Sequence, residues 1–117
     1  MGKRRIWMVE FLTPGMAGQD WFPQEDDARK SFSSRATDGD AGAVRLVRID
    51  LDEERLGIVG MPEIPEDREH NPIQYAVEDV RDNMSWKGTS TYVAYGVEAL
   101  EVDREVSDES VLPWNFG

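Results

Sequence analysis

The segment RRIWMVEFL, residues 4–12, limits the possible folds more than any other part of the sequence. Successive side chains of a β-strand point to opposite faces of its sheet. In this segment the apolar side chains fall on both faces: Trp7, Val9 and Phe11 on one, and Ile6, Met8 and Leu12 on the other. The pattern predicts a strand inside a sheet that is covered on both sides.

Three other segments indicate strands. AVRLVRIDL at 43–51 is rich in branched apolar residues, and residues 89–106 form a longer strand pattern that Gly96 interrupts with a bulge or a tight reversal. A brief edge strand is predicted at 56–60. Prolines within the acidic segment 52–71 argue against regular structure beyond it.

The end of the last strand has an alternating charge pattern. Leu100, Val102 and Val106 alternate with acidic residues, which are Glu101, Asp103 and Glu105. A regular strand would place these two sets on opposite faces. We therefore expect one dry face and one strongly negative face.

Two segments predict helices. Residues 24–36 have acids in the first turn and bases later, the order that complements a helix dipole, with a narrow apolar stripe at Ala28, Phe32 and Ala36. The second helix, 71–84, begins with an Asn-Pro pair typical of helix starts. Its apolar stripe comprises Ile73, Val77, Val80 and Met84.

This order of elements predicts a single α+β domain over residues 1–117. We expect a mainly antiparallel sheet of about four strands, with two helices packed on one face. Residues 52–71 would form an acidic, proline-containing loop and 107–117 a C-terminal tail.

Composition excludes some chemistry. The chain has no cysteine, so disulfides, thiolate metal sites and cysteine catalysis are ruled out, and His70 is its one histidine. No motif indicates a cofactor or a resident metal. The absence of disulfides and of any apolar run long enough to cross a membrane leads us to expect a cytoplasmic protein.

The distribution of charge is more informative than the net charge of −11. Residues 1–49 carry seven acids and eight bases, whereas 50–117 carry seventeen acids and five bases. Such a surface repels nucleic acid and lipid head groups and attracts basic surfaces. Direct binding to nucleic acid or a membrane is therefore not expected, and the oligomeric state stays open.

The acids of the second half of the chain form the candidate partner-binding set. If their segments adjoin, they make a negative face that could complement a cluster of Arg and Lys or imitate a phosphate backbone. The set comprises Asp50, Asp52, Glu53, Glu54, Glu63, Glu66, Asp67, Glu69, Glu78, Asp79, Asp82, Glu101, Asp103 and Glu105.

These features favour a small non-enzymatic inhibitor or regulator that occupies a basic, nucleic-acid-binding surface of a partner protein. In size and acidity the chain is similar to phage-encoded anti-defence inhibitors, including anti-CRISPR and other DNA-mimic proteins. Three alternatives stay open. The acidity could serve solubility alone, Asp50 and Asp52 could hold a metal in a small enzyme with Glu10 or His70 nearby, or Trp114 and Phe116 could dock an accessory subunit.

Overall fold

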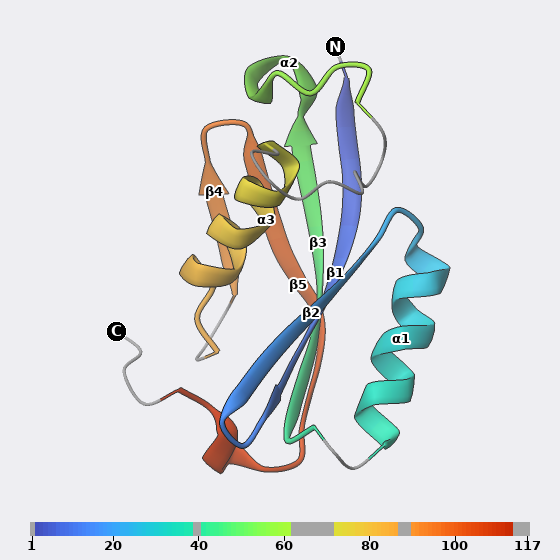
Figure 1. Ribbon diagram of the computed structural model, residues 1–117, viewed down its shortest axis with the longest axis vertical. Helices are drawn as coiled ribbons and strands as arrows, with labels where there is room; N and C mark the ends of the chain where they lie inside the picture. The colour runs from blue at the N-terminus through green and yellow to red at the C-terminus, as the bar shows by residue number, and fades with distance from the viewer. Residues whose placement is uncertain (1, 39–40, 62–71, 87–89, 114–117) are drawn as a thin grey trace.

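A five-stranded antiparallel sheet organises the protein, in the order β2-β1-β3-β5-β4 (Figure 1). The computed structural model describes residues 2–38, 41–61, 72–86 and 90–113. The strands are β1 (Lys3–Thr13), β2 (Met16–Phe22), β3 (Ala43–Asp52), β4 (Thr91–Ala94) and β5 (Val97–Val106). The helices are α1 (Glu25–Thr37), the single turn α2 (Glu53–Leu56) and α3 (Pro72–Asn83), followed late in the chain by a 3₁₀ turn at Glu109–Val111. The α+β class is confirmed, with five strands where about four were predicted.

The predicted central strand is confirmed. β1 pairs with β2 on one side and with β3 on the other, so both of its edges are hydrogen-bonded. The sequence analysis missed β2, because its residues MAGQDWF include glycine and polar side chains that hide a strand pattern. Gly15, with a φ of 80°, makes the tight turn between β1 and β2.

The prediction that both helices pack on one face is wrong. Ile6 and Met8 of β1 share a buried cluster with α3, whereas Trp7 and Val9 share another with α1. Because these β1 residues alternate, α1 and α3 cover opposite faces of the sheet (Figure 1). The physical reason is the sequence of β1 itself, whose two apolar faces each need a cover.

The apolar stripe predicted for the second helix is confirmed, since Ile73, Val77, Val80 and Met84 are all buried. In α1, Ala28 and Phe32 of the predicted stripe are buried, whereas Ala36 is half-buried. The predicted N-cap residue of the second helix, Asn71, lies outside the described residues. None of the helices in the described residues is long and apolar enough to cross a membrane.

The predicted edge strand at 56–60 is wrong. The chain instead forms α2, which ends at Gly57 in the left-handed conformation with a φ of 67°. Asp52 caps this turn by accepting a hydrogen bond from the backbone N–H of Arg55 (3.1 Å). Gly96, with a φ of 80°, makes the reversal that separates β4 from β5.

Candidate functional site

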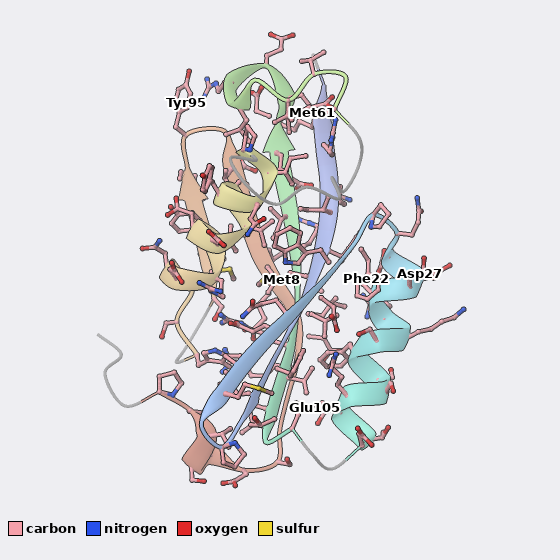
Figure 2. The ribbon with its side chains drawn as sticks, viewed as in Figure 1. Met8, Phe22, Asp27, Met61, Tyr95 and Glu105 are labelled. Carbon is pink, nitrogen blue, oxygen red and sulfur yellow. The ribbon has the colours of Figure 1, made fainter. Side chains whose placement is uncertain are left out.

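The predicted acidic face is divided on β5 by a β-bulge. Val47 of β3 pairs with Glu101, but the next pair joins Leu46 to Asp103, so Val102 is an extra residue. Glu101 and Arg104 therefore share the α3 face, while Asp103 and Glu105 lie on the α1 side (Figure 2). The prediction that Leu100 lies on a dry face of this strand is also wrong, since its side chain is 36% exposed.

The acids around α2 are held by arginines. Asp50 Oδ1 accepts from Arg5 Nε (2.8 Å), and Glu53 Oε2 accepts from Arg4 NH2 (2.7 Å). Among the described residues no group of three His, Asp or Glu side chains is placed to hold a metal ion. Glu10 lies on the other face of the sheet from Asp50, so the enzyme alternative cannot use Glu10 beside Asp50.

Other candidate residues fall outside the described part of the chain. This holds for four acids of the loop, for the single histidine and for the two aromatic residues of the docking alternative. They are Glu63, Glu66, Asp67, Glu69, His70, Trp114 and Phe116.

Three predicted acids come together in a groove of about 530 Å³ between α3 and the β4–β5 hairpin. They are Glu78, Asp79 and Asp82, and two tyrosines border the groove with them. Tyr75 is 54% exposed and Tyr95 is 73% exposed. Tyr95 projects from the turn between β4 and β5 (Figure 2), and the guanidinium of Arg55 lies 4.9 Å from the centroid of its ring. We call this site the α3 groove.

Asp79 is hydrogen-bonded to Tyr92 of β4. Its Oδ2 accepts a hydrogen bond of 2.8 Å from the Tyr92 hydroxyl, and this bond raises the pKa of the Tyr92 phenol. Asp82 pairs with Arg81 at 3.0 Å. The three carboxylates outnumber the two arginines beside them, Arg81 and Arg55, so the groove wall is negative.

The Tyr92 hydrogen bond gives a pH-dependent prediction. The pKa of the Tyr92 phenol is higher in the folded than in the unfolded protein. The stability that this hydrogen bond contributes is therefore fully present below the ordinary tyrosine pKa, and it is lost as pH rises through the raised pKa. In a titration followed by phenolate absorbance, the Tyr92 phenol should titrate above the ordinary tyrosine pKa. Asp79→Asn should return it toward the ordinary value of about 10, whereas Tyr75→Phe should leave it in place. A wild-type Tyr92 that titrates at the ordinary tyrosine pKa would contradict this assignment.

A buried ion pair, which sequence reasoning missed as a site, lies on the same face of the sheet. Arg45 of β3 is 0% exposed and Glu10 of β1 is 3% exposed, and the two are register partners. Arg45 NH2 lies 2.7 Å from Glu10 Oε1, and it also donates to the carbonyl of Met84 (2.9 Å). Arg45 NH1 donates to the carbonyl of Ser85 (3.1 Å). The available signal was a charged residue of opposite sign within the apolar part of each strand, Glu10 in β1 and Arg45 in β3.

The pair extends into a four-residue network. Arg45 NH1 lies 3.5 Å from Glu101 Oε2, and Arg104 binds both oxygens of Glu101 at 2.7 and 2.9 Å. The Trp86 ring contacts both guanidinium groups, at 4.2 Å from Arg45 and 5.4 Å from Arg104. The bulge at Val102 makes this possible, because residues three apart on a regular strand would face opposite sides.

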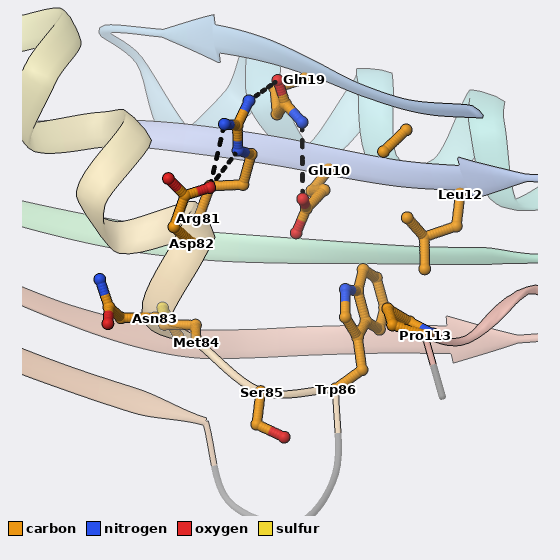
Figure 3. A pocket seen from close by; sticks show the side chains of 11 residues that line it. Glu10, Leu12, Gln19, Arg81, Asp82, Asn83, Met84, Ser85, Trp86 and Pro113 are labelled. Atoms are coloured by element: carbon orange, nitrogen blue, oxygen red, sulfur yellow. Dashed lines mark hydrogen bonds and ion pairs between the residues drawn. The ribbon is translucent and has the colours of Figure 1, made fainter. Parts of the chain in front are cut away.

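The network borders a second cavity, of about 550 Å³, between the β1–β2 hairpin and the end of α3. Figure 3 shows Gln19 linking the wall of this cavity to α3: it donates to Glu10 Oε2 (3.5 Å) and accepts from Arg81 NH1 (3.4 Å). Burial raises the pKa of the Glu10 carboxyl, and the Arg45 guanidinium opposes that shift. We call this space the Glu10 cavity.

Comparison of the chain with protein-family models, curated proteins and solved structures finds no match. The function must therefore be argued from these two sites alone.

Proposed function

We propose that this protein is a small non-enzymatic binding protein whose α3 groove takes a basic segment of a partner protein. The partner's segment would be rich in Arg or Lys, of the kind that proteins use to contact nucleic acid. Occupying it would make the chain an inhibitor of nucleic-acid binding, as phage anti-defence and DNA-mimic proteins are.

The observation that carries this proposal is the chemistry of the α3 groove. The carboxylates of Glu78, Asp79 and Asp82 line the groove together with the exposed rings of Tyr75 and Tyr95. An arginine side chain needs both groups, a carboxylate for its guanidinium and a flat apolar surface for its stem. The contact between Arg55 and Tyr95 is an example within the chain of a guanidinium lying on one of these rings.

The candidate acids outside the α3 groove that pair with arginines also support the groove as the binding site. Asp50 and Glu53 are already bound by arginines, and Glu101 is part of the buried network. A carboxylate held by an internal arginine has less charge to offer a partner. The groove acids keep a net negative charge, and the net charge of −11 speeds the encounter with a basic surface.

The test is a binding titration with fluorescent peptides that are short and rich in arginine or lysine. We expect saturable binding that weakens as salt is added, with no binding of an acidic peptide. Glu78→Lys replaces one attraction with a repulsion and should weaken binding by about three- to tenfold. Tyr75→Ala should weaken it by about two- to fivefold through loss of a cation–π contact.

Glu105→Lys is the matched control, because it makes the same change of charge on the α1 side of the sheet. It should reduce affinity much less than Glu78→Lys does. Circular dichroism spectra would verify that each variant is folded. Equal losses from both reversals would show that the peptide responds to net charge alone, and the α3 groove would then not be the site.

A further inference from the structure

We propose that the Glu10 cavity binds a small neutral molecule that presents a hydrogen-bond donor beside an acceptor, as a cyclic amide does. This site is separate from the α3 groove and does not depend on the function proposed for that groove. The two share Asp82 at their boundary, so the variants chosen below leave Asp82 unchanged.

The cavity has a free donor on its wall. Trp86 is only 5% exposed and lines the cavity. No hydrogen bond joins its indole Nε1 to any of the residues that the structure describes, and this nitrogen lies on the side of the ring toward Glu10 (Figure 3). This N–H lines the cavity, where water or a ligand can accept its hydrogen bond.

The cavity also has an acceptor with spare capacity. Glu10 Oε1 is bound by Arg45, but among the residues that the structure describes Oε2 accepts only the long 3.5 Å contact from Gln19. Contacts of that length are weak hydrogen bonds, and a carboxylate oxygen can accept two. A ligand N–H could therefore bind Oε2 without breaking the Arg45 pair.

The charges around the cavity select a neutral ligand. Arg45 and Arg104 balance Glu10 and Glu101, and Arg81 is paired with a neighbouring acid, Asp82. A charged molecule entering here would lose its water without gaining an unpaired counter-charge, which is costly. A neutral edge with one N–H and one C=O matches Glu10 Oε2 and Trp86 Nε1 together. A volume of about 550 Å³ leaves ample room for such a molecule.

The test uses the indole N–H signals of the ¹⁵N-labelled protein in two-dimensional NMR. The Trp86→Phe variant identifies the Trp86 signal among those of the four tryptophans. Titration with 2-pyrrolidone and with uracil should shift this signal in a saturable way. Acetate and n-butylammonium should not shift it.

The controls alter the cavity without touching the ion network. Ala17→Phe places a ring in the cavity and should abolish the shift, whereas Met16→Phe lies on the other face of β2 and should preserve it. The proposal is overturned if neither cyclic amide gives a saturable shift, or if the shift survives in Ala17→Phe. A stronger response to either charged probe would overturn the assignment of a neutral ligand.

Discussion

Replacement of Arg45 by methionine should lower the free energy of unfolding by about 3–5 kcal/mol. Methionine fills much of the volume but leaves the Glu10 carboxylate buried without its counter-charge. It also removes the donors to the carbonyls of Met84 and Ser85, which join the end of α3 to the sheet. Urea unfolding followed by tryptophan fluorescence would measure the loss.

Two further variants show whether the loss comes from the unpaired charge. Arg45→Met combined with Glu10→Leu removes both charges and should recover most of the stability, because an apolar pair can replace a buried ion pair. Arg48→Met changes the same strand at a half-exposed site whose nearest carboxylate, Asp50, is 3.8 Å away. It should cost less than about 1 kcal/mol. Comparable losses from Arg45→Met and Arg48→Met would refute the buried network as the cause.

Phe32→Ala should lower the free energy of unfolding by about 3–5 kcal/mol. Phe32 is the largest buried side chain of α1, and it packs against Trp7, Val9 and Leu46 on the face of the sheet that α3 does not reach. No other helix of the described residues covers this cluster, so the cavity left by the ring cannot be filled by α3. The shift of the urea midpoint would measure the cost, and Ser33→Ala on the exposed side of α1 should change it little.

A double-mutant cycle tests the two-sided arrangement itself. Ile73→Val on α3 should cost about 0.5–1.5 kcal/mol alone, and Phe32→Leu should cost less than about 1.5 kcal/mol. Because the two residues belong to separate clusters on opposite faces, their costs should add to within about 0.5 kcal/mol. A larger coupling energy would indicate that the two helices share one core.

Much of this fold was predictable from strong periodic patterns. The segment 4–12 gave β1 as an internal strand, and the apolar stripe of α3 is buried as its spacing indicated. The same segment also indicated how the helices are arranged, because a strand that is apolar on both faces needs an element packed on each face of the sheet. The prediction that both helices pack on one face conflicted with the two apolar faces of this strand. In the structure, each face is covered by a different helix.

The parts that could not be predicted depend on pairing between distant strands. β2 is a strand because it borders β1, although its own residues have weak strand preference. The bulge at Val102 leaves no mark in the sequence, and it moved Asp103 and Glu105 away from Glu101. The acids were identifiable from sequence, but their distribution over the two faces of the sheet and their arginine partners were not.

The bulge has a consequence for how this chain tolerates change. Before Val102 the odd-numbered residues of β5, such as Glu101, face α3. After it the even-numbered residues, such as Arg104, face α3. Removing Val102 would close the bulge without turning the later residues over, because Asp103 would still pair with Leu46 and Arg104 with Arg45. Arg104 would therefore stay beside Glu101 and Trp86. By contrast, a one-residue slip of a regularly paired strand turns its side chains to the other face of the sheet. The bulge therefore marks the position at which β5 can lose a residue and still present the same side chains to each helix.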